Sequence, residues 1–323
     1  MTQIIQGDCL TVLKTLPTVS VHCCVTSPPY WGLRDYGCEG QLGLEKTPEE
    51  YVAKLVEVFG EVRRVLRDDG TVWLNLGDSY CANRGNTIDK PGFDNKAAQG
   101  HAGLAIRPHK IGGNGIKEKD LVGIPWMVAF ALRADGWYLR SDIIWAKPNP
   151  MPESVADRPT KSHEYLFLLT KSAKYYYDAE AIKEKQTEST IKRAAYGWNG
   201  RTDDNSNGSR TGSTFKRMAE TGEPIGTIPA DGKRNKRSVW TVATVGNGCG
   251  EHFAVFPPKL ITPCILAGCP VGGTVLDPFG GSGTVGEVSE NHGRNSILIE
   301  LKPEYCEMAK QRTAQQGLFA RSA

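Results

Sequence analysis

The feature that most constrains the fold is a glycine-rich turn that follows a short apolar run near the end of the chain. Residues 274–283 pass from β-branched and apolar positions into the turn Asp-Pro-Phe-Gly-Gly-Ser-Gly. Gly281, Gly283 and Gly286 have the G-x-G-x-x-G spacing, which lets a ligand approach backbone amides where a helix begins. Glu300 ends the next apolar run, where a carboxylate can accept hydrogen bonds from ribose hydroxyls. This unit predicts a nucleoside-binding α/β sheet; a turn that only packs helix on strand is the alternative.

Strand patterns alternate with amphipathic helix patterns along most of the chain, as in α/β proteins. Strands are predicted near 4–5 and over 21–26, 71–76, 137–145, 165–169, 274–276 and 296–299. Helices are predicted over 9–16, 124–134, 258–266 and 282–291, and from residues 47 and 303. No helix pattern separates the strands 137–145 and 165–169, which indicates an antiparallel pair at a sheet edge.

Two segments lack such patterns. Residues 82–119 are rich in Gly, Asn and Lys and predict a flexible loop, and residues 186–250 hold long polar clusters. Between residues 183 and 237 there are 12 Lys or Arg against 7 Asp or Glu. The basic excess is compatible with a segment that contacts nucleic acid and equally with a solvated linker.

Composition places the chain among ordinary globular proteins. It has 323 residues, 39% of them hydrophobic, and a formal net charge of +3, which is too small to indicate an acidic partner by itself. Its nine cysteines lack C-x-x-C spacing, which favours buried reduced thiols over disulfides or structural zinc. The amino terminus has no signal-peptide pattern and no apolar run approaches ~18 residues. We expect a cytoplasmic protein with no membrane association and no metal.

A second unusual motif, Ser-Pro-Pro-Tyr-Trp at 27–31, directly follows the strand predicted over 21–26. Two consecutive prolines keep the backbone extended, so their carbonyls lack a local amide partner and stay available as acceptors. The Ser27 hydroxyl adds an acceptor, and Tyr30 and Trp31 supply flat apolar faces. Such a site can grip an amino group while its ring is stacked; a strand closed by an aromatic plug is the alternative.

Together the two motifs resemble those of the amino-methylating DNA methyltransferases, which have an S/D/N-P-P-Y/F/W catalytic motif and an F-x-G-x-G cofactor motif. The catalytic motif comes first here, similar to the permuted group called β. Residues 142–153 and 157–165 also look like the middle of bacterial and phage members. The resemblance covers nearly the whole chain except the two loop-like segments.

The resemblance implies a Rossmann-like, S-adenosylmethionine-dependent methyltransferase fold: an α/β fold whose mixed, mostly parallel sheet has seven strands, one of them antiparallel. It implies one catalytic domain over residues 1–323 with circularly permuted motifs. Residues 186–250 are then an inserted candidate target-recognition region.

It also implies roles for individual residues. The implied catalytic residues are Ser27, Pro28, Pro29 and Tyr30. The implied S-adenosylmethionine site comprises Asp8 near the adenine, Glu300 on the ribose, and Phe253, Asp277, Pro278, Phe279, Gly280, Gly281, Ser282, Gly283 and Thr284. Candidate DNA contacts are Trp31, Lys147, Arg158, His163, Lys233, Arg234, Lys236 and Arg237. Trp31 is equally compatible with a core position. Lys147, Arg158 and His163 are equally compatible with solvated surface positions. Asp78 is compatible with either the cofactor cleft or a turn cap.

The implied reaction is direct methyl transfer to the exocyclic amino nitrogen of a base flipped out of double-stranded DNA. Serine at the first motif position favours cytosine N4 in the family, and aspartate favours adenine N6, which stays the alternative. A cognate restriction endonuclease is a candidate partner, and the oligomeric state is open.

Three other classes fit parts of the pattern. A nicotinamide oxidoreductase would use the glycine turn and Glu300 but leaves 27–31 without a role. A cytosine-carbon methyltransferase would need Cys264 as nucleophile, although Cys264 falls in an apolar helix pattern. A non-enzymatic DNA-binding module would use only the basic segment, and RNA is a further possible substrate.

Overall fold

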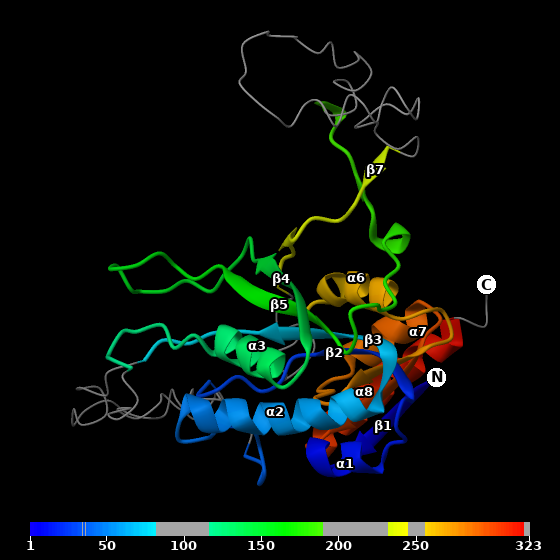
Figure 1. Ribbon diagram of the computed structural model, residues 1–323, viewed down its shortest axis with the longest axis horizontal. Coiled ribbons are helices and arrows are strands. Elements are labelled where there is room, and N and C mark those ends of the chain that lie inside the picture. The colour runs from blue at the N-terminus through cyan, green and yellow to red at the C-terminus, as the bar shows by residue number, and fades with distance from the viewer. Residues whose placement is uncertain (34, 36, 82–115, 190–231, 245–255, 320–323) are drawn as a thin grey trace. The chain divides into compact units, whose positions relative to one another are not determined.

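The strand order of one large sheet organises most of the chain. The computed structural model describes residues 1–33, 35, 37–81, 116–189, 232–244 and 256–319. The chain forms two compact units: Met1–Asp178 with Ser238–Ala323, and Ala179–Arg237. The sheet belongs to the first unit, with the order β1-β10-β9-β2-β3-β5-β4-β8 (Figure 1).

The elements follow the periodicities of the sequence, with bounds shifted by a few residues. The strands of the sheet are β1 (Thr2–Gln6), β2 (Val21–Thr26), β3 (Leu66–Leu76), β4 (Tyr138–Ala146), β5 (His163–Thr170), β8 (Val239–Thr241), β9 (Thr274–Asp277) and β10 (Asn295–Glu300). The helices of the same unit are α1 (Cys9–Thr15), α2 (Pro48–Val65), α3 (Ile124–Ala134), α6 (Pro258–Gly268), α7 (Thr284–Asn291) and α8 (Pro303–Phe319).

The expected mixed, mostly parallel α/β sheet is confirmed, with β5 as its antiparallel strand between β3 and β4. The described part of the sheet has eight strands, one more than the seven expected. The additional strand is β8, which pairs parallel with β4 and takes the edge that the antiparallel pair was expected to form. Its three residues are too short to give a periodic signal, but Trp240 is buried and packs near Trp73, with ring centroids 6.4 Å apart.

The direction of the crossovers places helices on both faces of the sheet. The chain moves in one direction along the sheet through β1-α1-β2, β2-α2-β3 and β3-α3-β4. Helix α6 then leads back to β9, and β9-α7-β10 moves in the opposite direction. Because such crossovers are right-handed, opposite directions put helices on opposite faces. Accordingly α2 lies beside α1 and α3, and α7 lies beside α6 and α8 (Figure 1). The direction reverses between β9 and β2, the position where doubly wound sheets bind ligands.

Helix α2 illustrates how local sequence sets these elements. Thr47 is its N-cap and accepts a hydrogen bond from the Glu50 amide, with Pro48 in the first turn. One face of the helix, including Tyr51, Leu55 and Phe59, is buried against the core. Burial of this stripe, more than helix propensity, holds the helix in place.

Some expectations concern residues that the structure does not describe. Most of the loop predicted over 82–119 and of the region 186–250 lies outside the described residues. The described cysteines are all free thiols, and all of them except Cys38 are buried. Among the described residues, no helix is long and apolar enough to cross a membrane.

Candidate active site

The carboxyl ends of β2 and β9 meet where the sheet reverses direction. The Thr26 hydroxyl, which directly precedes the Pro-Pro motif, donates a 2.6 Å hydrogen bond to Asp277 Oδ1. The same oxygen accepts from the Phe279 amide at 3.0 Å. Burial raises the pKa of Asp277 from its usual 3.8 to about 7, against the lowering effect of these two donors. The two motifs, far apart in sequence, therefore lie side by side.

Glu300 holds the glycine turn from the neighbouring strand. Its carboxylate accepts hydrogen bonds from the Gly281 amide at 2.9 Å and from the Lys302 amide at 2.8 Å. Burial raises the pKa of Glu300, and these amides oppose that effect. Gly281 and Gly283 have φ of +49° and +86°, so the turn uses the left-handed conformations that glycine adopts readily. The turn thus presents backbone and one carboxylate at the end of β9 and β10.

The other residues of the predicted cofactor site lie in several parts of the chain. Pro278 and Gly280 belong to the turn, and Phe279 packs against the core. Asp8 caps α1 by accepting hydrogen bonds from the Thr11 amide and hydroxyl, both at 2.8 Å. It lies near Glu300 because the preceding Gly7 amide donates to the Glu300 carbonyl at 2.9 Å. Phe253 lies outside the described residues.

Ser282 and Thr284 direct their hydroxyls toward helix α8. Arg312 Nη1 donates to Ser282 Oγ at 3.0 Å and to Thr284 Oγ1 at 2.9 Å, and Arg312 also pairs with Glu287. Both hydroxyls thus accept hydrogen bonds from the protein, and in this structure these residues connect the glycine turn to helix α8.

The Pro-Pro turn offers fewer free acceptors than expected. The Tyr51 hydroxyl donates to the Pro29 carbonyl at 2.8 Å, so this carbonyl has a partner from helix α2. Within the described part of the chain, no donor bonds to the Pro28 carbonyl. The expectation that both carbonyls stay free is therefore wrong for Pro29, because a tertiary contact supplies the donor that the local backbone lacks.

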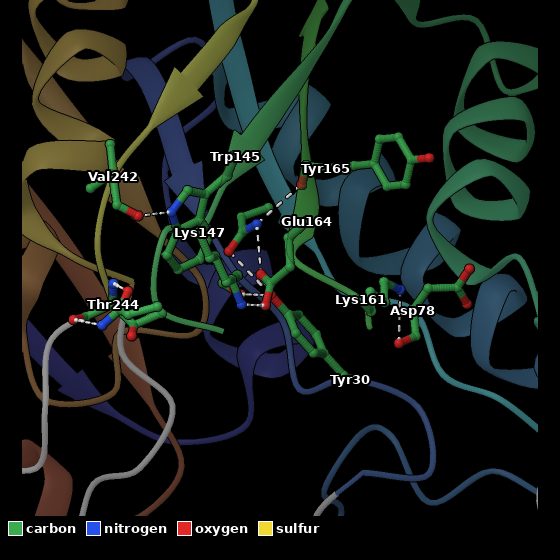
Figure 2. Close-up of polar contacts among 12 residues, drawn as sticks. Tyr30, Asp78, Trp145, Lys147, Lys161, Glu164, Tyr165, Val242 and Thr244 are labelled. Carbon is green, nitrogen blue, oxygen red and sulfur yellow. Dashed lines mark hydrogen bonds and ion pairs between the residues drawn. The ribbon is translucent and has the colours of Figure 1, made fainter. Parts of the chain in front are cut away.

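Tyr30 extends from this turn into a polar network. Its ring lies over Gly77, where an added Cβ would stand 2.5 Å from Cε2. Its hydroxyl donates to Glu164 Oε2 at 2.7 Å and lies 3.1 Å from Asn75 Oδ1, while Ser27 Oγ donates to it at 3.3 Å. Figure 2 shows Glu164 between Tyr30 and Lys147, the latter forming an ion pair with the other carboxylate oxygen.

Trp31 is a core residue. Its side chain is 2% exposed, and its indole nitrogen donates to the Glu45 carbonyl at 2.9 Å. Its predicted contact with DNA is corrected accordingly, because a buried ring with a satisfied N–H presents no face to a ligand.

Arg158 and His163, from the middle of the chain, contact other residues of that region and, in the case of Arg158, Tyr80. Arg158 pairs with Glu153 and covers the ring of Tyr80, with its guanidinium carbon 3.6 Å from the ring centroid. His163 packs edge-on against Tyr165.

Asp78 caps a helix. Its carboxylate accepts hydrogen bonds from the Gly123 and Ile124 amides at the start of α3, the shortest of them 3.0 Å. Lys161 donates to the Asp78 carbonyl at 3.1 Å, as Figure 2 shows, and burial lowers the pKa of Lys161. Of the two alternatives for Asp78, the structure shows the cap.

The smaller unit carries the basic residues predicted from composition. Its described elements are a 3-10 helix (Glu180–Ile182) and the antiparallel strands β6 (Glu184–Lys185) and β7 (Lys233–Arg234). Glu184 pairs with Arg234 at 3.0 Å and Arg237 at 2.8 Å. Partial burial raises the pKa of Glu184, but the two arginines outweigh it and the net pKa is lowered.

Sequence reasoning missed Asn75, Gly77 and Glu164 as site residues. Glu164 lies within the stretch that looked family-like, but nothing local distinguished it from its neighbours. Its role depends on antiparallel pairing of β5 with β3, which aligns Tyr165 with Leu76. In the described part of the chain, no group of three or more His, Cys, Asp or Glu is arranged to hold a metal ion.

Solved structures of DNA methyltransferases have this fold. The cytosine-N4-specific PvuII DNA methyltransferase superimposes with a TM-score of 0.60 over 96% of this chain and 86% of that chain, at 18% identity. A putative DNA modification methylase of Thermus thermophilus, complexed with S-adenosyl-L-methionine, has a TM-score of 0.56 at 23% identity and covers 98% of this chain and 96% of that chain. The doubly wound sheet of this chain is thus the fold of these solved DNA methyltransferases, one of which is complexed with S-adenosyl-L-methionine.

Sequence relatives specify the family. The family model N6_N4_Mtase, described as DNA methylase, matches residues 21–311. The Type II methyltransferase M.Cfr9I of Citrobacter freundii is 48% identical over 95% of this chain and 86% of its own length. M.SmaI of Serratia marcescens is 45% identical over 96% of this chain and 90% of its own. The chain belongs to this DNA methylase family and is a DNA methyltransferase that acts on cytosine N4 or adenine N6.

This result decides among the rival classes. Family membership explains both motifs, whereas an oxidoreductase leaves the Pro-Pro motif without a role and a non-enzymatic module leaves both motifs without one. Cys264 is completely buried in α6, with its thiol directed at the Leu260 carbonyl, so it is not an exposed nucleophile.

Proposed function

We propose that this enzyme transfers a methyl group from S-adenosylmethionine to N4 of cytosine in double-stranded DNA. The observation that carries the choice of base is Ser27 at the first position of the Pro-Pro motif, where serine favours cytosine in the family that this chain resembles. A neutral hydroxyl is a weaker acceptor than a carboxylate, and this difference separates the two base preferences.

The cofactor is proposed to lie at the ends of β9 and β10. When bound, S-adenosylmethionine supplies a methyl group on a positively charged sulfur. The residues present suit it: Gly281 and Gly283 give the turn its left-handed backbone, Glu300 can accept from ribose hydroxyls, and Asp277 is a buried acid next to Thr26. Asp8 is proposed for the adenine end; Ser282 and Thr284 would contribute through their backbone, since Arg312 engages their hydroxyls.

The base is proposed to enter beside Ser27. The amino group of cytosine is a poor nucleophile because its lone pair delocalises into the ring. Ser27 Oγ and the Pro28 carbonyl would accept its two hydrogens and direct the nitrogen lone pair toward the methyl group, while the Tyr30 ring stacks on the base. Orientation and fixed polar groups then supply the rate enhancement without a covalent intermediate. A base in a duplex must be flipped out to reach this position.

We propose that the smaller unit, which overlaps the predicted region 186–250, takes part in recognition of the target sequence. It carries Lys233, Arg234, Lys236 and Arg237, candidates for phosphate contacts, and Lys147, Arg158 and His163 of the larger unit remain further candidates for DNA contacts. The Type II names of the relatives are the support for a cognate restriction endonuclease as partner.

The test is direct. Plasmid DNA incubated with the purified protein and S-adenosylmethionine is digested to nucleosides and analysed by mass spectrometry. We expect N4-methylcytosine, lost in Ser27→Ala and retained in Cys264→Ala. N6-methyladenine as the product would overturn the choice of base.

A further inference from the structure

The Tyr30 hydroxyl joins Ser27 to a partly buried ion pair at the ends of two other strands. Glu164 lies near the start of β5 and Lys147 directly follows β4, and their side chains are 15% and 18% exposed. Asn75 of β3 donates through Nδ2 to the same Glu164 oxygen that accepts from Tyr30, at 3.2 Å. Figure 2 shows Lys147 and Tyr30 converging on Glu164.

The chemistry of these groups sets the direction of the hydrogen bonds. An ionised carboxylate can only accept, and a charged acceptor at 2.7 Å outcompetes the neutral Asn75 oxygen at 3.1 Å for the single phenolic proton. Burial and the adjacent Glu164 charge hold the pKa of Tyr30 well above its usual value, so the phenol keeps that proton. The Tyr30 proton therefore points at Glu164.

This direction determines what Ser27 can do. With its proton committed to Glu164, the Tyr30 oxygen has only lone pairs to offer its other neighbour. Ser27 Oγ, 3.3 Å away, consequently donates to Tyr30. The Ser27 lone pairs are then left facing away from Tyr30, available to an incoming amino group. A reversed chain would point the Ser27 hydrogen at that group instead.

We propose that Glu164, held by Lys147 and Asn75, is a positioning residue that acts through Tyr30 to make the Ser27 hydroxyl a hydrogen-bond acceptor for the target amino group. The proposal rests on the proposed function of Ser27. Stability alone explains the pair poorly, because removing two charges from water opposes their attraction and a buried ion pair adds little net stability.

A double-mutant cycle tests this role. In Glu164→Gln, Lys147 holds the amide oxygen, so the amide NH₂ faces Tyr30 and no longer accepts its proton. That proton is then free to turn toward Asn75 Oδ1 or Ser27. We expect kcat for DNA methylation to fall about 10- to 100-fold, with KM for DNA within about twofold. Tyr30→Phe keeps the ring but removes the link and should lower kcat by a similar factor. Because Glu164 acts through that link, adding Glu164→Gln to Tyr30→Phe should change kcat less than about twofold.

The controls separate positioning from folding. Glu61→Gln removes the acid of the Glu61–Arg64 pair on α2, away from the Pro-Pro turn, and should leave kcat unchanged. Calorimetric binding of S-adenosylhomocysteine should match wild type for all variants, which shows that they are folded, although Glu164→Gln should lower the thermal midpoint because it leaves the Lys147 charge uncompensated. Multiplicative effects of Tyr30→Phe and Glu164→Gln, or an unchanged kcat in Glu164→Gln, would overturn the inference. A wild type that methylates adenine overturns only the proposed base, and one that methylates neither base overturns both proposals.

Discussion

Asp277 is the residue at which the two halves of the site meet, and its environment is unusual for an acid. It is 2% exposed, and its donors are Thr26 and the Phe279 amide. Glu300 lies near enough for its charge to raise the pKa of Asp277 further. Such a carboxyl is protonated more readily in the folded protein than in the unfolded chain, which makes stability depend on pH.

The sign of this dependence follows from the two pKa values. Between pH 4 and pH 7 the folded protein holds a proton on Asp277 that the unfolded chain has lost, so the free energy of unfolding falls as pH rises and levels off above pH 7. A rise of about three pKa units corresponds to an effect on the order of 4 kcal/mol. Asp277→Asn keeps an oxygen for both donors and should flatten this slope.

Urea unfolding of the cofactor-free protein at pH 4, 5.5, 7 and 8 measures the slope. The exposed Asp142→Asn is the control and should keep the slope of wild type. Parallel curves for wild type and Asp277→Asn would show that Asp277 titrates normally. Glu300, whose pKa is also raised, would account for a residual slope in the variant.

The element that determines the cofactor side of the site is the turn between β9 and α7. Gly283 is the N-cap of α7 with φ +86°, and a Cβ there would stand 2.8 Å from Cα and Cβ of Ala309 in α8. Helix α8 therefore packs against the turn, and Glu300 also holds the turn through its hydrogen bond with the Gly281 amide. Gly123, the N-cap of α3, has nearly the same φ of +85° but open space around it.

These two caps make a matched pair. Gly123→Ala should lower the free energy of unfolding by about 1–2 kcal/mol, since only the left-handed backbone opposes alanine. Gly283→Ala should lose about 1–3 kcal/mol more because α8 must move. It should also weaken S-adenosylhomocysteine binding, which Gly123→Ala should not. Urea unfolding and calorimetry measure both effects; equal destabilisation by the two variants would mean that α8 adjusts without strain.

At the scale of the whole molecule, charge is distributed unevenly. The formal net charge is only +3, whereas the segment 183–237 has five more basic than acidic residues. Glu184 orders two of these arginines within the smaller unit. Each contact with a DNA phosphate releases counterions. The salt dependence of DNA binding therefore reports the number of phosphate contacts more reliably than the affinity at one salt concentration.

Lys233 and Lys236 are the two lysines among the basic residues 233–237. If both contact phosphates, the variant Lys233→Gln with Lys236→Gln should reduce the slope of log K against log salt by about 1.8, at about 0.9 per phosphate. Fluorescence anisotropy with a labelled duplex between 50 and 200 mM salt measures it. Lys14→Gln with Lys310→Gln, on α1 and α8, is the control for net charge. An unchanged slope in the first variant would remove both lysines from the interface.

Short-range patterns predicted a large part of this protein. The strand before the Pro-Pro motif, the Thr47 cap and the glycine turn all follow from residues within one or two turns of each other. Two such units in an α/β sheet, joined to the family resemblance, predicted Ser27 as a catalytic residue and Asp277 as a cofactor-binding residue. Local sequence carries this information because periodicity, capping and left-handed glycines act within a few residues.

Only the tertiary structure decided what surrounds those motifs. Glu164 reaches Tyr30 from 134 residues away because β5 inserts antiparallel between β3 and β4. Trp31 lies in the core and Ser282 faces Arg312 because neighbouring elements pack there, although both residues belong to recognisable motifs. Strand order and packing depend on contacts between distant segments, so a motif names the reacting residues while the fold determines their partners, their charge and the direction of their hydrogen bonds.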